Sequence, residues 1–142
     1  LFVSLFFTFF VTVIIIYVIR KYNKKLEHLA DNDLLTNVNN RRVFNSKLEH
    51  SILIHQRHNQ SMNLLFLDID NFKDINDKFG HATGDKALIR IASILKNNIR
   101  KSDLLARWGG EEFVVAYVNS SFEDSLIATE KLKNLKTYQF LQ

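Results

Sequence analysis

The sequence predicts an α/β domain with a mostly antiparallel central sheet, preceded by a transmembrane helix. Two observations support this: the first 19 residues carry no charge, and the remainder alternates helical with strand-like apolar patterns. With 142 residues, 46% of them hydrophobic, the chain is long enough for one domain plus an appendage. The absence of cysteine excludes a disulfide framework, a cysteine-based zinc site and a cysteine nucleophile. The formal net charge of +4 does not indicate a nucleic-acid partner.

Residues 1–19 form the predicted transmembrane helix. A helix of this length rises about 28 Å, close to the hydrocarbon thickness of a bilayer. Residues 20–25 then place four cations in six positions, a flank that favours the cytoplasmic side of the membrane. We therefore expect an inner-membrane protein, single-pass or multi-pass, whose following domain is cytoplasmic. Because the chain begins with Leu1, we also expect residues that precede it in the parent protein.

A linker or signalling helix is predicted over residues 20–32. Tyr22, Leu26 and Leu29 follow one another at helical spacing and form one narrow apolar stripe. The stripe fits a short parallel coiled-coil seam between two copies, or a helix that rests on its own domain. One heptad does not decide between these two interpretations.

The remaining residues, 33–142, alternate helix and strand. The apolar spacing predicts a helix over 40–57, a strand over 63–69, a polar turn or short helix to 78, a helix over 84–100, strands over 104–108 and 113–118, and a last helix over 121–136.

Three details of these elements are predicted as well. The strand over 63–69 is almost continuously apolar, which is typical of a strand covered on both faces. Gly80 and Gly84 are expected to interrupt the polar segment, and Gly109-Gly110 to close a tight hairpin. The last helix is expected to pack through one face, formed by Phe122, Leu126, Thr129 and Leu132.

Two acidic stretches predict a metal site. Asp68 and Asp70 follow the apolar strand on one face, where either can ligate a hard cation. Glu111 and Glu112 follow Gly109-Gly110, and their mutual repulsion needs a cation or solvent to relieve it. If the hairpin pairs beside the strand, three carboxylates gather around Mg²⁺, and the two glycines let a phosphate or sugar approach the backbone. The alternative is a helix cap at Asp70 and a solvated turn at the glutamates.

Two stretches of the sequence carry a resemblance to a known family. They are FLDIDNFKDINDKFGHATGD at residues 66–85 and RWGGEEF at residues 107–113. Together they closely resemble the GGDEF domain of diguanylate cyclases, and residues 33–36 and 40–42 are similar to its N-terminal motif. The resemblance covers about residues 31–136. It implies a palm-like α/β domain related to nucleotidyl cyclases, with residues 33–142 incomplete at the C-terminus. It also implies a homodimer that condenses two GTP into cyclic di-GMP and two pyrophosphates.

The resemblance further implies roles for single residues at the metal site. Asp68 and Glu111 would hold Mg²⁺ or Mn²⁺, and the Ile69 carbonyl would assist. Glu112 would bind metal or activate the ribose 3′-hydroxyl, and the sequence leaves open which glutamate is the base.

The resemblance implies substrate contacts outside the acidic stretches. Asn76 and Asp85 would recognise guanine, as an amide and a carboxylate together can read a purine edge, whereas the same segment taken alone is a polar loop. Phe72 and Lys73 would lie beside the triphosphate. Gly109 and Gly110, which lack side chains, would let the triphosphate approach the protein backbone.

An RxxD pattern at Arg100 and Asp103 corresponds to the family's product-inhibition site, where cyclic di-GMP would bind. The alternative is a cationic helix C-terminus followed by an acidic loop residue. Two other functions also stay open: a catalytically inactive cyclic di-GMP receptor, and the regulatory GGDEF module of a hybrid with a phosphodiesterase domain. Residues 1–142 alone are expected to be inactive if catalysis needs the C-terminal part of the domain that the resemblance implies after residue 142.

Overall fold

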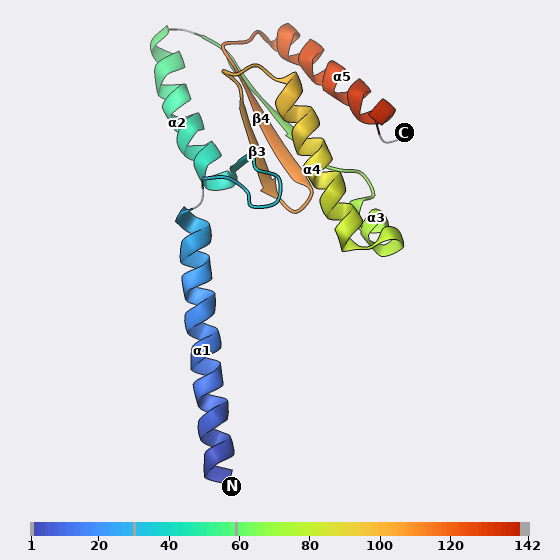
Figure 1. Cartoon of the computed structure of the whole chain (residues 1–142). Helices are drawn as coiled ribbons and strands as arrows, with labels where there is room; N and C mark the ends of the chain where they lie inside the picture. The colour runs from blue at the N-terminus through green and yellow to red at the C-terminus, as the bar shows by residue number, and fades with distance from the viewer. Residues whose placement is uncertain (1, 30, 59, 140–142) are drawn as a thin grey trace. The chain divides into compact units, whose positions relative to one another are not determined.

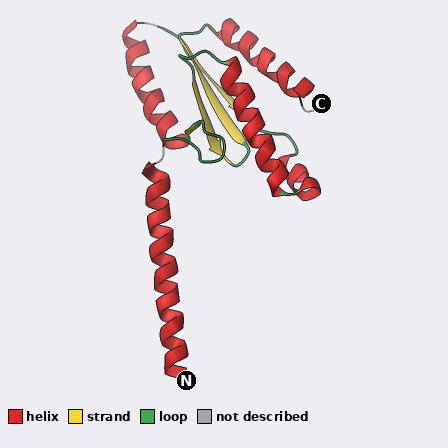
Figure 2. Ribbon diagram, viewed as in Figure 1, coloured by secondary structure: helices red, strands yellow, loops and turns green. Residues whose placement is uncertain are grey.

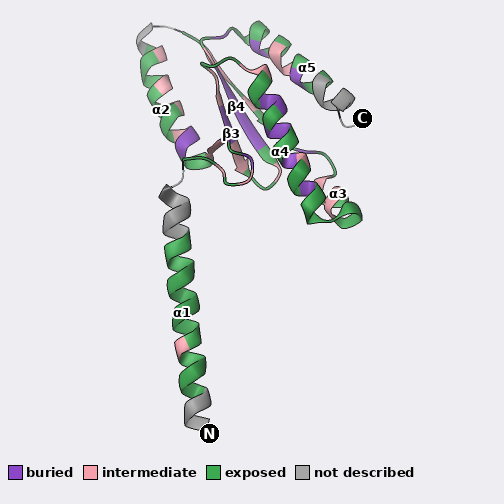
Figure 3. Cartoon of the chain, viewed as in Figure 1, coloured by how far each residue is buried: buried purple, intermediate pink, exposed green. Residues whose placement is uncertain are grey.

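The computed structural model describes residues 2–29, 31–58 and 60–139. The chain divides into two compact units, residues 1–31 and 32–142. The first unit is a single helix, α1 (Phe2–Leu29), in which the predicted transmembrane and linker segments are continuous. The described residues include one helix long and apolar enough to cross a membrane, at Phe6–Asn23; its residues are exposed except Val11, which is half-buried (Figure 3). The Leu26 and Leu29 side chains of the predicted stripe lie outside the described residues.

In the described residues, the second unit has a four-stranded sheet and the helices α2 to α5, arranged as Figures 1 and 2 show. The strand order is β1-β3-β4-β2, in which β1 runs parallel to β3 and the other pairs are antiparallel. The predicted α/β fold with a mostly antiparallel sheet is thereby confirmed. Its elements are β1 (Asn39–Asn40), α2 (Arg41–His58), β2 (Met62–Leu67), α3 (Phe72–Phe79), α4 (His81–Asn98), β3 (Leu104–Gly109), β4 (Glu112–Val118) and α5 (Phe122–Gln139).

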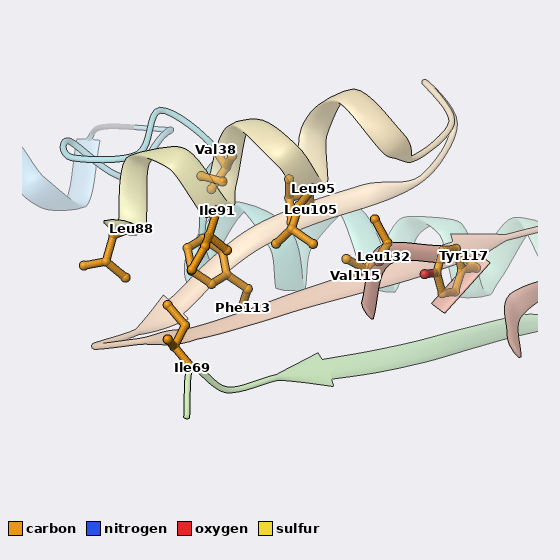
Figure 4. Close-up of a cluster of buried hydrophobic side chains, with 11 residues drawn as sticks. Val38, Ile69, Leu88, Ile91, Leu95, Leu105, Phe113, Val115, Tyr117 and Leu132 are labelled. Atoms are coloured by element: carbon orange, nitrogen blue, oxygen red, sulfur yellow. The ribbon is translucent and has the colours of Figure 1, made fainter. Parts of the chain in front are cut away.

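One face of the sheet carries the larger hydrophobic cluster, under α4 and α5 (Figure 4). Leu88 and Ile91 of α4 are buried against Phe113 and Val115 of β4. The inward α4 residues recur at three- and four-residue spacing, as the sequence predicted. The central strand β4 is therefore buried along most of its length, and it begins at the exposed Glu112.

The other face carries a smaller cluster under α2, centred on the buried Phe44. The Trp108 ring lies edge-on to Phe44, with 6.1 Å between ring centroids, and edge-on to Phe66 at 5.7 Å. The guanidinium of Arg41 lies 4.3 Å from the Trp108 ring centroid. These contacts make Trp108 a packing residue of the α2 face.

The prediction that the strand over 63–69 is covered on both faces is wrong. β2 is an edge strand, and Leu64 and Phe66 are 49% and 60% exposed. An apolar run predicts a fully covered strand only if helices reach both faces, and here α2 lies over β3 instead.

Two predictions about helices also need correction. The predicted face of α5 is right at Leu132, which is buried, and at Thr129, which is half-buried, but Phe122 and Leu126 are exposed, and Ser125 and Ala128 pack inward in their place. Asn63 explains this rotation, because its side-chain amide donates to Ser125 Oγ at 3.0 Å and fixes the start of α5. Gly84 does not break the chain but lies within α4, which begins at His81.

Candidate functional site

The two acidic stretches meet at one end of the sheet. In the antiparallel pair of β2 and β4, Leu67 lies opposite Phe113. Continued by one residue, this register sets Asp68 opposite Glu112, a position at which Cβ atoms are typically about 5 Å apart. The condition set by the sequence, that the hairpin pairs beside the Asp68 strand, is therefore met.

Side-chain alternation decides which glutamate faces Asp68. Ile69 is buried in the α4-side cluster together with Phe113 (Figure 4), so the residue before each, Asp68 or Glu112, faces the opposite side. Glu111 lies in the turn, one residue earlier than Glu112. The register thus pairs Asp68 with Glu112 more directly than with Glu111.

The expected gathering of three carboxylates is not found. Among the residues that the structure describes, no group of three or more His, Asp or Glu side chains is placed to hold a metal ion. The physical reason is the position of the turn, because Glu111 lies in the turn before β4 and only Glu112 is in register with Asp68. Two carboxylates and a backbone carbonyl remain as an oxygen donor set. The Ile69 carbonyl accepts a long hydrogen bond, 3.3 Å, from the Phe72 amide, which occupies one of its two lone pairs.

The glycines of the hairpin face open space. A Cβ built on Gly109 or Gly110 meets no atom within 4 Å. Gly110 has φ 51°, in the left-handed region that favours glycine, whereas the backbone of Gly109 makes no such demand. The turn therefore leaves its backbone accessible to a bulky ligand, as the sequence predicted.

Arg107 stabilises this turn by hydrogen bonds, and the sequence did not predict this role for it. Its Nε and Nη2 atoms donate to the Gly110 carbonyl at 2.9 and 2.7 Å. Its Nη1 donates to Asp33 Oδ1 at 3.2 Å, in an ion pair whose side chains are 16% and 25% exposed. The hairpin is thereby tied to the first turn of the domain. The sequence offers only a weak signal for this contact: an arginine two residues before Gly109-Gly110, and an aspartate 74 positions earlier in the chain.

Asp33 is the centre of that first turn. Its Oδ1 accepts hydrogen bonds from the Thr36 amide at 2.8 Å and from Thr36 Oγ1 at 2.6 Å. Burial raises the pKa of the Asp33 carboxyl, but the Thr36 hydrogen bonds and the Arg107 guanidinium outweigh it, so that the pKa lies below its ordinary value of 3.8. Asp33 is thus a stable anion and a firm anchor for Arg107.

The predicted guanine-recognition residues lie together on α3 and α4. Asn76 of α3 is in contact range of Gly84 of α4, the residue directly before the exposed Asp85. Phe72 also reaches Gly84 and packs on the α4-side cluster, whereas Lys73 is exposed. The structure therefore brings Asn76 and Asp85 into one region although nine positions separate them.

Arg100 and Asp103 lie at the other end of β4, away from the hairpin turn. Asp103 Oδ2 accepts from the Arg100 amide at 2.9 Å, and its Oδ1 accepts from the Val118 amide at 3.2 Å. Both residues line a hollow of about 320 Å³ between the end of α4 and α5, which Tyr117 and Lys131 also line. Asp103 therefore stabilises the loop before β3 and the end of β4 by accepting from two backbone amides, while the Arg100 side chain is exposed.

Residues 30–139 match the family described as diguanylate cyclase, GGDEF domain. Because the match covers most of the chain, this protein belongs to the GGDEF family. The chain is 43% identical over 93 residues to diguanylate cyclase TpbB of Pseudomonas aeruginosa, a match that covers 66% of this chain and 21% of that protein. The chain thus spans about a fifth of the length of this relative.

Solved structures show the same fold. The crystal structure of diguanylate cyclase SiaD with its activator SiaC, from Pseudomonas aeruginosa, matches with a TM-score of 0.71 and 34% identity, over 87% of this chain and 48% of that one. The GGDEF domain of DgcB from Caulobacter crescentus, in complex with c-di-GMP, matches with a TM-score of 0.70 and 32% identity, over 72% of this chain and 60% of that one.

Proposed function

We propose that this chain is the catalytic domain of a membrane-anchored diguanylate cyclase, which condenses two GTP into cyclic di-GMP and two pyrophosphates. The observation that carries the proposal is the β2–β4 register, which continues into Asp68 opposite Glu112 beside a turn with an open backbone. Membership in a family whose relatives are named diguanylate cyclases supports the reaction. The apolar helix α1 supports the membrane anchor, with the domain on the cytoplasmic side.

The donor set fits Mg²⁺ or Mn²⁺. Carboxylate and carbonyl oxygens are the ligands that hard divalent cations prefer, and Asp68, Glu112 and the Ile69 carbonyl supply three of them. When bound, such an ion screens the charge of the triphosphate and lowers the pKa of the attacking hydroxyl. Glu111, which lies in the turn and not opposite Asp68, is left as the candidate base.

Each bond formed is an ester between a ribose 3′-oxygen and the α-phosphorus of the other GTP. The bond from that phosphorus to the pyrophosphate oxygen breaks, and the 3′-hydroxyl proton leaves to a base. Asn76 and Asp85 would hold the guanine, while Phe72 and Lys73 would lie beside the triphosphate. One domain would hold one GTP, so the ring closes only when two protomers face each other.

Product inhibition would use the far end of β4. Arg100 supplies a planar guanidinium that suits phosphate and guanine, and it lines the hollow between α4 and α5. The related domain of DgcB was solved with c-di-GMP, which supports a product site in the family.

The test is a GTP turnover assay on the full-length protein in detergent or nanodiscs, with the product identified by mass spectrometry. We expect cyclic di-GMP and pyrophosphate in a 1:2 ratio, with activity abolished by EDTA and restored by Mg²⁺ or Mn²⁺. Cyclic di-GMP binding without turnover would contradict the proposal and identify a receptor. GTP-dependent stimulation of a phosphodiesterase domain in the parent, again without synthesis, would identify a regulatory module.

A further inference from the structure

Gly84 is an unusual residue for its position. It is the fourth residue of α4 and is buried, and glycine inside a helix is less stable than alanine by about 1 kcal/mol. Its backbone is helical, so no positive φ requires glycine there. The reason for glycine at this position must therefore lie in what surrounds it.

The surroundings of Gly84 are two side chains of α3. A Cβ built on Gly84 would overlap Asn76 Oδ1, and it would lie 3.0 Å from Asn76 Cγ and 3.1 Å from Phe72 Cζ. Both neighbours are ends of side chains and not backbone, so a methyl group would displace them without breaking α4. Gly80 and the two hairpin glycines differ, because a Cβ there meets nothing within 4 Å.

The Asn76 amide depends on this contact for its position. Among the described residues, no hydrogen bond of the Asn76 side-chain amide is found. Its backbone carbonyl, in contrast, accepts from the Gly80 amide at 2.8 Å. The close approach to Gly84 therefore constrains where the amide points, with Oδ1 nearest the Gly84 backbone, while the Nδ2 donors have no partner among the described residues and stay available to a ligand.

We propose that Gly84 is a specificity-determining position, which sets the Asn76 amide beside Asp85 so that the two read the base of the bound nucleotide together. This inference rests on the proposed function, because it concerns the same nucleotide site. Gly84 makes no contact with the base itself and is a positioning residue. A side chain there would turn Asn76 away while Asp85, the next residue, keeps its place on α4.

The test is a double-mutant cycle of Gly84→Ala and Asn76→Ala in the full-length protein, with GTP and ATP as alternative substrates. Alone, G84A should raise KM for GTP about tenfold, as expected for one lost hydrogen bond to the base, with kcat within twofold. The preference for GTP over ATP should fall by the same factor. In the N76A background, G84A should change KM less than twofold, since no amide is left to displace. Lys86→Ala, an exposed position of α4, is the control and should leave KM unchanged.

Thermal unfolding gives a readout that needs no nucleotide. The N76A/G84A variant should melt a few degrees above N76A, because alanine replaces glycine in a helix with the obstructing amide removed. G84A alone should show no such gain. If G84A alone does not fold, the double variant still compares directly with N76A.

Equal effects of G84A on KM in both backgrounds, or no effect in either, would overturn the inference. If the wild type does not turn over or bind GTP, the proposed function fails and the assignment of specificity fails with it. The melting temperatures of the four proteins need no nucleotide, so they still show whether Asn76 and Gly84 are coupled. A failure of the proposed function is thereby distinguished from a failure of this inference.

Discussion

The two ends of the central strand β4 use polar residues in opposite ways. At the far end, Asp103 accepts from two backbone amides, and the Ser61 hydroxyl and the Asn63 side-chain amide both donate to the Ser120 carbonyl. At the hairpin end, Glu112 is exposed and both glycines face open space. The far end satisfies these polar groups within the fold, whereas the hairpin end exposes Glu112 and the backbone of its two glycines. Such exposure is what a ligand site requires, and the Arg107–Asp33 ion pair is one contact that stabilises that end internally.

Removal of a carboxylate at the hairpin end should have the largest effect on activity. Asp68→Asn and Glu112→Gln should each lower kcat/KM for cyclic di-GMP synthesis at least about 100-fold, because each deletes a charged ligand of the ion. For Glu112→Gln, the free energy of unfolding should change by less than about 0.5 kcal/mol, as for other exposed positions. Glu123→Gln, an exposed glutamate of α5, is the control. Turnover within threefold of the wild type in both variants would remove the assigned metal site.

Loss of the guanidinium under the turn should affect both stability and activity. Arg107→Ala removes both donors to the Gly110 carbonyl and leaves the half-buried Asp33 without its counter-ion. We expect a loss of about 2 kcal/mol in the free energy of unfolding by urea. We also expect a fall of about tenfold in kcat, because the turn that carries Glu111 is less well positioned. Arg90→Ala, on the exposed side of α4, should change neither quantity.

Asp103→Ala should weaken the opposite end and spare the chemistry. Two backbone amides, those of Arg100 and Val118, lose their acceptor, so we expect a loss of about 1–2 kcal/mol in the free energy of unfolding. The kcat at low product concentration should stay within twofold of the wild type. A kcat that falls as far as in Arg107→Ala would show that the two ends of β4 are not functionally distinct.

The anchor of the turn should give a pH dependence of stability. The pKa of Asp33 is lower in the folded chain than its ordinary value of 3.8. Its contribution is therefore fully present above about pH 4 and is lost as the pH falls through the lowered folded pKa. The stability advantage of the wild type over Asp33→Asn should be constant from pH 5 to 7 and shrink below pH 4. An advantage that does not change between pH 7 and pH 3 would contradict the anionic anchor.

The smallest effect on the fold is expected at Arg100. Its side chain is exposed, so Arg100→Ala should change stability by less than about 0.5 kcal/mol. The concentration of cyclic di-GMP that halves the initial rate should rise at least about tenfold. Lys101→Ala serves as a matched control for charge. Unchanged inhibition in Arg100→Ala would assign the RxxD pattern to loop structure alone.

Local patterns in the sequence predicted much of the fold. Helices α2 and α4 and the existence of the hairpin follow from apolar spacing and from the glycine pair, since these signals act within one element. The turn lies one residue later than predicted, at Gly110 and Glu111, because Gly109 pairs with Glu112 within the sheet. The acidic corner was predicted only on the condition that the hairpin pairs beside the Asp68 strand, because chain order alone does not determine that β2 pairs with β4. The reading of β2 as a covered strand failed because coverage depends on where α2 lies.

Other features arise only from long-range packing. The contact between Arg107 and Asp33 joins residues 74 positions apart, and no local signal encodes it. β1 has two residues, too few for any periodicity. The inward face of α5 is set by Asn63, which belongs to another strand. Gly84 looked like a helix breaker because its neighbours Asn76 and Phe72 lie on a different helix.

The most direct measurement is the anomalous diffraction of Mn²⁺ in crystals of the protein grown with a non-hydrolysable GTP analogue. The account predicts a manganese peak within coordination distance of both the Asp68 and the Glu112 carboxylates, next to the triphosphate, and its loss in Asp68→Asn. A triphosphate bound with its manganese remote from either carboxylate would contradict the account.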